Sequence, residues 1–214
     1  MAAPVKNLDL HGSMPDTSPA VLLLIDVVTD FSFEGGPRIA DSAITMAERL
    51  RRLKRRCRHA RIPAIYVNDN QGRWREDQQS LVTRCLESRS RGRRMVELLR
   101  PELEDYFIAK PKHSGFFATA LERLLIYLQA HTLILTGIGT NLCVLFTASD
   151  AHMRDYQLVV PRDCVTAIEP SDHRYALDQM RRLFEADTRE SRRLELQRIT
   201  GRATRPGMSR SSAR

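Results

Sequence analysis

The sequence predicts an α/β fold, a three-layer sandwich in which a mostly parallel central sheet of about six strands carries helices on both faces. Short apolar runs alternate along the chain with longer segments of helical periodicity, a pattern typical of parallel strands joined by crossover helices. The apolar run at Val21–Ile25 is continuous, as expected of a strand buried on both faces. The chain has 214 residues, enough for one such domain with a substantial core.

The first half of the chain supplies two strands and three helices. Apolar residues recur at helical spacing between Ile39 and Ala60, which indicates a helix with one buried stripe. The amides and acid that follow the second apolar run are typical of turn chemistry. The predicted elements are, in order, a loose polar arm (1–19), a strand (Val21–Ile25), a turn (Gly35–Pro37), a helix (Ile39–Ala60), a strand (Pro63–Val67), a loop (Asn68–Trp74), and two short helices broken near Gly92 (77–100).

The second half continues the alternation and ends in a basic tail. Its predicted elements are, in order, a strand (Asp105–Ala109), a helix (Thr119–Ala130), a strand (Thr132–Thr136), a helix from Thr140 or Asn141, a strand (Tyr156–Val160), a helix capped by Ser171 (Ser171–Glu185), and a short sixth strand near Ala186–Arg189. We expect one domain over residues 20–197. The segment 198–214 has almost no apolar content, which predicts a disordered tail.

Charge and cysteine content narrow the function classes. The formal net charge is +8, and arginine runs such as Arg51–Arg58 and Arg89–Arg94 carry much of it. No aromatic residues interleave with these runs, so we expect solvated surfaces and no nucleic-acid partner. The four cysteines lack CxxC or zinc-site spacing, which favours reduced thiols in a cytoplasmic protein. We find neither a bilayer-spanning apolar run nor a signal-type apolar segment, and we expect no membrane association.

Chemically active side chains follow several of the predicted strands. Asp26, Asp69, Lys110 and Cys143 each stand at or just beyond the carboxyl end of a strand. Right-handed crossovers bring these ends to one edge of a parallel sheet, where open α/β sheets bind ligands. We therefore expect an acid, a base and a thiol to meet at this edge.

The stretch around Cys143 allows three interpretations. Thr140 or Asn141 would cap a helix whose first turn holds Cys143, and the free N–H groups there would favour the thiolate. Alternatively, Cys143 is a small buried hydrophobe. Thirdly, Gly137-x-Gly139 after a strand resembles half of a dinucleotide-binding loop, with Asp163 in the place of the ribose-binding acid. Leu142 occupies the place of the third glycine in that fingerprint.

Three blocks carry a resemblance to a known family. They are LLLIDVVTDF (22–31), KPKHSGF (110–116) and TGIGTNLCVLFTASDA (136–151). In this order and spacing, they resemble the isochorismatase-like cysteine hydrolase superfamily, which includes nicotinamidases and N-carbamoylsarcosine amidases. The resemblance covers roughly Pro19 to Leu196 and implies that superfamily's Rossmann-type fold.

The resemblance also implies roles for individual residues. The superfamily's catalytic triad corresponds to Asp26, Lys110 and Cys143, with Lys112 as a nearby alternative to Lys110. Its oxyanion hole corresponds to the N–H groups of Gly139 and Cys143, and its cis peptide bond to Ile138–Gly139. We expect the substrate pocket to be lined by Phe31, Asn68, Asp69, Trp74 and Ile138, of which Asn68, Asp69 and Trp74 belong to the loop after the second strand.

These roles predict a cysteine hydrolase that cleaves a small amide or related C–N bond through a thioester. The alternatives are a vinyl-ether hydrolase of the isochorismatase type, which does not need the cysteine, and an inactive homologue that acts as a binding protein. Nicotinamidases hold a metal with an Asp and several histidines, whereas the loop beside Asp69 has no histidine, so we expect neither metal nor cofactor. His113, the histidine nearest the site, is expected to cap a turn. We also expect a homo-oligomer, either a dimer or a tetramer, and a small-molecule substrate.

Overall fold

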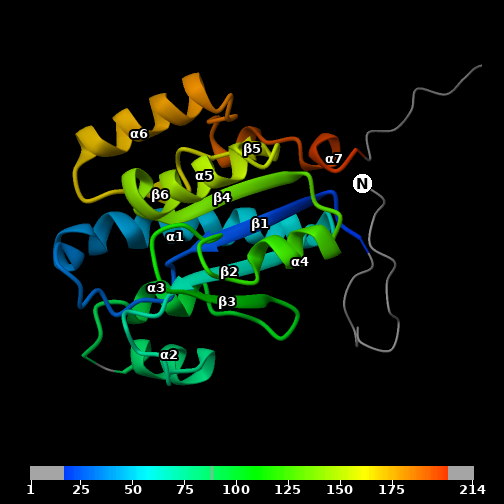
Figure 1. Cartoon of the computed structure of the whole chain (residues 1–214). Coiled ribbons are helices and arrows are strands. Elements are labelled where there is room, and N and C mark those ends of the chain that lie inside the picture. Colours follow the sequence, from blue (N-terminus) through cyan, green and yellow to red (C-terminus); the bar gives the residue numbers. More distant parts are fainter. Residues whose placement is uncertain (1–16, 88, 202–214) are drawn as a thin grey trace, which may run out of the picture.

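A computed structural model of the chain describes residues 17–87 and 89–201. Figure 1 shows the elements along the chain. They are β1 (Ala20–Ile25), α1 (Gly36–His59), β2 (Ala64–Asp69), α2 (Gln78–Cys85), α3 (Arg93–Leu98), β3 (Tyr106–Lys110), α4 (Leu121–Tyr127), β4 (Thr132–Ile138), the π-helical turn η2 (Thr140–Val144), α5 (Leu145–His152), β5 (Gln157–Val159), β6 (Val165–Thr166), α6 (Pro170–Leu183), the 3₁₀ turn η3 (Ser191–Arg193) and α7 (Leu196–Ile199).

The sheet has six strands, and every pairing in it is parallel. Its order is β3-β2-β1-β4-β5, with the short β6 paired to the far end of β4. β1 lies at the centre, where Ile25 stands beside Val67 of β2 and Gly137 of β4. At the edge of the sheet, Asp69 of β2 is in register with Lys110 of β3. The predicted α/β fold with a six-stranded parallel sheet is therefore confirmed.

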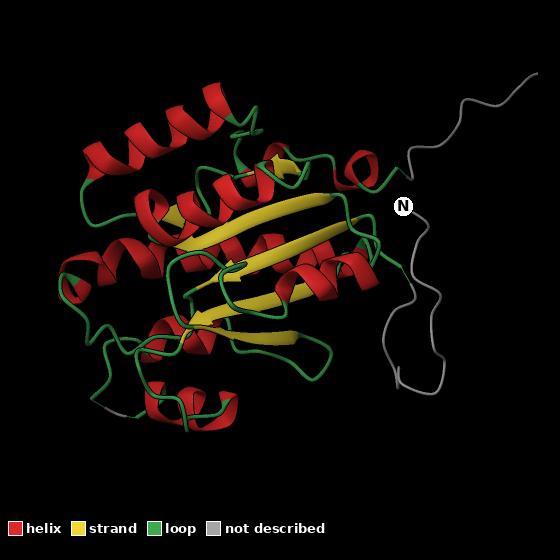
Figure 2. Ribbon diagram, viewed as in Figure 1, coloured by secondary structure: helices red, strands yellow, loops and turns green. Residues whose placement is uncertain are grey.

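Helices cover both faces of the sheet, as Figure 2 shows. The central strand β1 is fully buried, and its alternate residues belong to two separate clusters. Leu22 and Leu24 pack on the side of α1, α2 and α3, whereas Leu23 and Ile25 pack on the side of α4, α5 and α6. The continuous apolar run arises because each face of β1 needs its own apolar residues.

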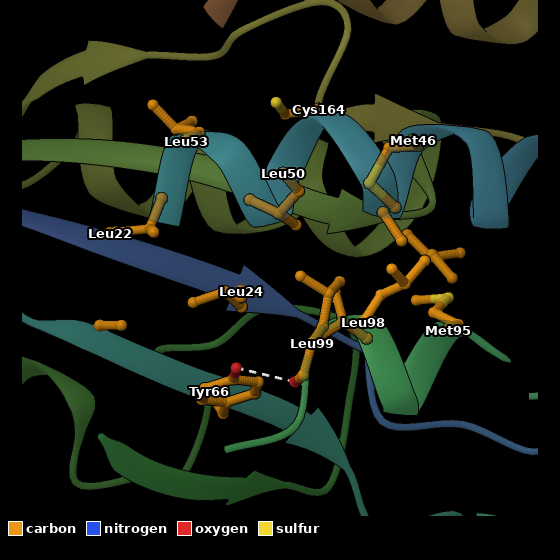
Figure 3. Packing of buried hydrophobic residues seen from close by; sticks show 14 of the residues in the cluster. Leu22, Leu24, Met46, Leu50, Leu53, Tyr66, Met95, Leu98, Leu99 and Cys164 are labelled. Atoms are coloured by element: carbon orange, nitrogen blue, oxygen red, sulfur yellow. Dashed lines mark hydrogen bonds between the residues drawn. The ribbon is translucent and has the colours of Figure 1, made fainter. Parts of the chain in front are cut away.

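The cluster on the α1 side is drawn in Figure 3. The predicted helical stripe supplies it, with Met46, Leu50 and Leu53 buried in this cluster. Tyr66 of β2 is buried there, and its hydroxyl donates a 2.8 Å hydrogen bond to the Leu99 carbonyl. That bond satisfies the polar tip of an otherwise apolar side chain.

Several predicted boundaries are corrected by the structure. The second strand extends through Asp69, so Asn68 and Asp69 belong to β2 and not to a loop. Likewise, Gly137 and Ile138 continue β4. The sixth strand is Val165–Thr166; the segment predicted for it forms only a single bridge, between Asp187 and Val159. Helix α6 begins at Pro170, after Glu169 and not after Ser171, because proline is pre-set for a first helical position.

The ends of the described chain pack against the domain. Ser18, in the predicted arm, is buried and donates its N–H to the Leu128 carbonyl at 2.7 Å. At the other end, residues 198–201 belong to α7 and the turn after it, with Thr200 buried. The rest of the predicted arm and tail, residues 1–16 and 202–214, lies outside the described residues. None of the helices described is long and apolar enough to cross a bilayer.

Candidate active site

The carboxyl ends of the three strands β1, β3 and β4 bring the three predicted catalytic side chains together. Asp26 follows β1, Lys110 is the last residue of β3, and Cys143 lies in η2 just beyond β4. The Lys110 ammonium is 2.9 Å from the Asp26 carboxylate and 3.6 Å from the Cys143 sulfur. Asp26 has a left-handed backbone with φ of 53°, a conformation that turns the chain sharply as it leaves β1.

Lys110 is the centre of this cluster. Its side chain is fully buried, and its ammonium also lies 3.4 Å from the Asp69 carboxylate. Burial lowers the pKa of Lys110, but Asp26, Cys143 and Asp69 together outweigh burial and hold this pKa above its ordinary value. The lysine is therefore a fixed positive charge. Lys112, the alternative considered from the sequence, is exposed and, in the part of the chain that the structure describes, forms no hydrogen bond or ion pair with the cluster.

Asp26 is placed to act as a base. Its second carboxylate oxygen accepts a 2.6 Å hydrogen bond from the Asp69 N–H. Burial raises the pKa of the Asp26 carboxyl, and the Lys110 charge and the hydrogen bonds from Cys143, Lys110 and Asp69 offset only part of this effect. An aspartate with a raised pKa is a stronger base than one in water, and the Lys110 ammonium contacts both this carboxylate and the Cys143 sulfur.

Cys143 is a buried thiol in its resting state, with only 8% of the residue exposed. Burial raises the pKa of Cys143, the Asp26 carboxylate raises it further, and Lys110 only partly opposes them. The expectation that a helix N-terminus stabilises the thiolate is therefore wrong for the resting site. The turn η2 has an unusual π-type bond from the Val144 N–H to the Gly139 carbonyl, at 3.2 Å; such turns are frequent at functional sites.

The backbone before Cys143 has the features expected of an anion-binding turn. The Ile138–Gly139 peptide bond is cis. The Gly139 carbonyl accepts hydrogen bonds from the N–H groups of Leu142 and Val144. Gly139 precedes η2 and Cys143 lies within this turn, where the first backbone N–H groups of a helix lack partners within the helix. Both N–H groups thus remain candidates for binding an oxyanion.

Most of the predicted pocket residues serve other purposes in the structure. Phe31 and Ile138 are buried in the core cluster on the α1 side, whereas Cys143 belongs to the opposite cluster. The buried Asn68 side chain bonds the backbone of Val28, accepting from its N–H at 3.0 Å and donating to its carbonyl at 2.9 Å. Asn68 therefore fixes the backbone that follows β1, and its side-chain amide is occupied by these hydrogen bonds.

Trp74, which was expected to line the substrate pocket, lies on the surface. It is 77% exposed, and the hollow that it lines is formed by residues 72–76 and Ser80. The structure does not place Trp74 beside the triad. Of the five predicted pocket residues, Asp69 contacts the catalytic cluster, through Lys110 and the Asp26 carboxylate.

Asp69 lacks the surroundings of a metal ligand. One of its oxygens accepts from the Gln71 N–H at 2.7 Å, and the other faces Lys110. Among the residues described, no group of three or more His, Cys, Asp or Glu side chains is arranged to hold a metal ion. A lysine ammonium repels a cation, so these residues do not fit the metal site of nicotinamidases. The absence of a metal stays a prediction.

Three further residues, His113, Phe146 and Thr147, lie near the site, and the sequence predicted no catalytic or pocket role for them. The His113 Nδ1 lies 4.0 Å from the Cys143 sulfur, and its ring packs on Phe146 with ring centres 5.6 Å apart. Thr147 is buried, donates to the Cys143 carbonyl at 2.7 Å and accepts from the Gly115 N–H at 3.0 Å. The spacing of His113 three residues after Lys110 is the only sequence signal that points to the site.

The dinucleotide-binding interpretation has little support from the geometry. Asp163, expected in the place of the ribose-binding acid, accepts hydrogen bonds from the N–H and hydroxyl of Ser191 at 2.6 and 2.8 Å. Its carboxylate is thus occupied within the fold. Gly137 has φ of 114° and packs against the β1 backbone at Ile25, so this glycine serves the contact between strands.

Comparison with known proteins gives a consistent family. The isochorismatase domain model matches residues 20–190. The uncharacterized isochorismatase family protein YaaI of Bacillus subtilis is 38% identical over 166 residues, which cover 78% of this chain and 91% of that protein. The ureidoacrylate amidohydrolase RutB of Yersinia enterocolitica is 42% identical over 76 residues, which span only 33% of its length.

The fold is also similar to that of a solved amidase. The N-carbamoylsarcosine amidase from Thermoplasma acidophilum superposes with a TM-score of 0.62 at 25% identity. The superposition covers 82% of this chain and 98% of the amidase.

Proposed function

Because the chain belongs to the isochorismatase family, a family of hydrolases with amidase relatives, we propose that it hydrolyses a small amide or related C–N bond with Cys143 as the nucleophile. The observation that carries the proposal is the position of the Lys110 ammonium, 2.9 Å from Asp26 and 3.6 Å from the Cys143 sulfur. A nucleophile, a base and a fixed charge within contact distance are the parts that acyl transfer requires.

In the first half of the reaction, Asp26 accepts the proton of the Cys143 thiol as the sulfur attacks the carbonyl carbon. The carbonyl π electrons move to the oxygen, and the N–H groups of Gly139 and Cys143 bind the resulting oxyanion. When the tetrahedral intermediate collapses, the C–N bond breaks and Asp26 returns its proton to the leaving amine. The product of this half is a thioester on Cys143.

In the second half, Asp26 accepts a proton from a water molecule as the water attacks the thioester. The C–S bond then breaks, the acid product leaves, and the sulfur regains its proton from Asp26. Lys110 carries no proton in either half. Its positive charge stabilises one negative charge in the site. That negative charge is on Asp26 when the thiol is protonated and on the Cys143 sulfur when Asp26 holds the proton.

The relatives suggest where to look for the substrate. N-carbamoyl amines and ureido acids are the substrate types named for the amidase and for RutB, and both contain a carbonyl bonded to nitrogen. We propose that this chain acts on a small molecule of this kind, and we expect no metal to be required.

The test is a screen of primary amides, N-carbamoyl amines and ureido acids with the purified protein, followed by release of amine or ammonia. Mass spectrometry of the enzyme quenched during turnover should show an acyl adduct on Cys143. Cys143→Ser should lower turnover by at least about a thousandfold, as expected when a triad member is lost. Cys85→Ser, a buried cysteine outside the site, should retain activity.

Other outcomes would identify the alternatives. Hydrolysis of a vinyl ether that survives Cys143→Ser would indicate chemistry of the isochorismatase type and reject the nucleophile. A protein that consumes no member of the screen and forms no adduct on Cys143 would indicate a binding homologue.

A further inference from the structure

A hollow rich in arginine lies on the surface between α1, the loop after β5, the start of α6 and η3. Its volume is about 550 Å³, within the range typical of small-ligand sites. We call it the arginine hollow. It is lined by Arg49, Arg52, Arg162, Asp163, His173, Glu190, Ser191 and Arg192.

The lining of the arginine hollow carries more positive than negative charge. Four guanidinium groups face two carboxylates. Glu190 is shared between two of the arginines, with Arg162 at 2.9 Å and Arg192 at 2.8 Å. Asp163 is held by Ser191. Within the described residues, Arg49 and Arg52 have no hydrogen-bond or ion-pair partner, so two guanidinium groups remain available to an incoming anion.

The turn η3, which forms one side of the arginine hollow, is held in place by hydrogen bonds to its neighbours. Arg56 of α1 donates to the carbonyls of Ser191 and Leu194, both at 2.6 Å. These bonds tie η3 to α1, while Asp163 ties η3 to the loop after β5. A fixed frame lowers the entropic cost of ordering a site on binding.

We propose that the arginine hollow binds the phosphate group of a small molecule. Guanidinium groups match phosphate oxygens with two parallel hydrogen bonds, and a charged pair of this kind is stronger than a neutral one. A phosphate monoester carries a charge of about −1.5 to −2 at neutral pH, which balances the formal excess of two positive charges. The volume leaves room for an organic group beyond the phosphate.

This site is separate from the catalytic cluster. None of the triad residues lines it. One hydrogen bond connects the two regions, because the His173 Nδ1 lies 2.9 Å from the hydroxyl of the buried Thr140, the first residue of η2. Phosphate binding depends on arginines alone, so it should persist in Cys143→Ser and does not rest on the proposed hydrolase activity.

The experiment is calorimetric titration of the full chain with inorganic pyrophosphate and with adenosine 5′-monophosphate, using adenosine as the probe without phosphate. The test variant is Arg49→Gln with Arg52→Gln. The matched control is Arg51→Gln with Arg55→Gln, which removes two charges from exposed positions of the same helix outside the hollow. Thermal melting should show that both variants fold.

We expect both phosphate probes to bind and adenosine not to bind. The test variant should weaken binding at least about tenfold, as expected when charge-assisted hydrogen bonds are lost, and the control should stay within about twofold. The proposal fails if neither phosphate probe binds at millimolar concentration, or if the control weakens binding as much as the test variant. It also fails if a single-stranded DNA 12-mer binds more tightly than either probe through the same arginines, because the site would then serve a nucleic-acid backbone.

Discussion

Replacing Lys110 by methionine tests how the site holds its negative charge. At an effective dielectric constant of about 20, opposite unit charges attract by about 6 kcal/mol at the Lys110–Asp26 distance of 2.9 Å, and by about 5 kcal/mol at the Lys110–Cys143 distance of 3.6 Å. One pKa unit corresponds to about 1.4 kcal/mol, so losing the ammonium should raise the pKa of either group by about 3 to 4 units.

The same numbers show what Lys110 does not do. The two attractions differ by only about 1 kcal/mol, in favour of ionised Asp26. Lys110 therefore has little effect on proton transfer between Cys143 and Asp26. Its main effect is to prevent Asp26 and Cys143 from both being protonated at the same time. In Lys110→Met, the pair should hold both protons near neutral pH, and the sulfur should lose its base.

The assay is the rate of iodoacetamide alkylation at Cys143, measured by mass spectrometry across pH. In the unmodified protein the rate should fall as pH drops through the raised pKa of Asp26, because a protonated carboxyl cannot accept the thiol proton. In Lys110→Met, this acid limb should move up by about 3 pH units, which lowers the rate by up to roughly a thousandfold at pH values below the original limb. Lys112→Met, an exposed lysine two residues away, should leave the limb in place. An unmoved limb in a folded Lys110→Met protein would refute the assigned role of the lysine.

Three further predictions concern the cysteines, the metal and one glycine. Cys143 should be alkylated faster than Cys57, Cys85 and Cys164 near neutral pH, since those three are at most 1% exposed, whereas Cys143 is 8% exposed and shares its site with the Asp26 base; equal rates in peptide mapping would argue against Cys143 as the nucleophile. Elemental analysis of the purified protein should find no stoichiometric zinc, iron or manganese; one tightly bound metal that is lost in Asp69→Ala would overturn this. Gly137→Ala should lower the free energy of unfolding by about 3 kcal/mol, because its φ is 114° and the added Cβ would lie 2.0 Å from the Ile25 carbonyl oxygen. Gly72→Ala, with positive φ but open space around it, should cost about 1 kcal/mol in the same thermal melt; equal losses would show that the contact with β1 does not matter.

The sequence by itself predicted the fold class and four chemically active side chains at one edge of the sheet, and its resemblance to a known family selected three of them as a candidate triad. The run at Val21–Ile25 and the stripe from Ile39 have periods that only strands and helices of one buried sheet satisfy. Because parallel crossovers collect the carboxyl ends of strands at one edge, Asp26, Lys110 and Cys143 could be expected together before any distance was known. These inferences depend on local pattern and on topology, and the sequence contains both.

The tertiary structure alone decided which of their neighbours share the site. Phe31 and Trp74 follow the ends of the first and second predicted strands and were expected in the pocket, but Phe31 packs in the core on the α1 side and Trp74 faces solvent. His113 was expected only to cap a turn, but it approaches the Cys143 sulfur. One interpretation of the sequence was a thiolate at Cys143 favoured by the helix terminus, whereas burial and the Asp26 charge raise the pKa of this thiol. The face on which a side chain lies and the balance between burial and charge depend on contacts between segments far apart in the chain, and local sequence patterns do not encode those contacts.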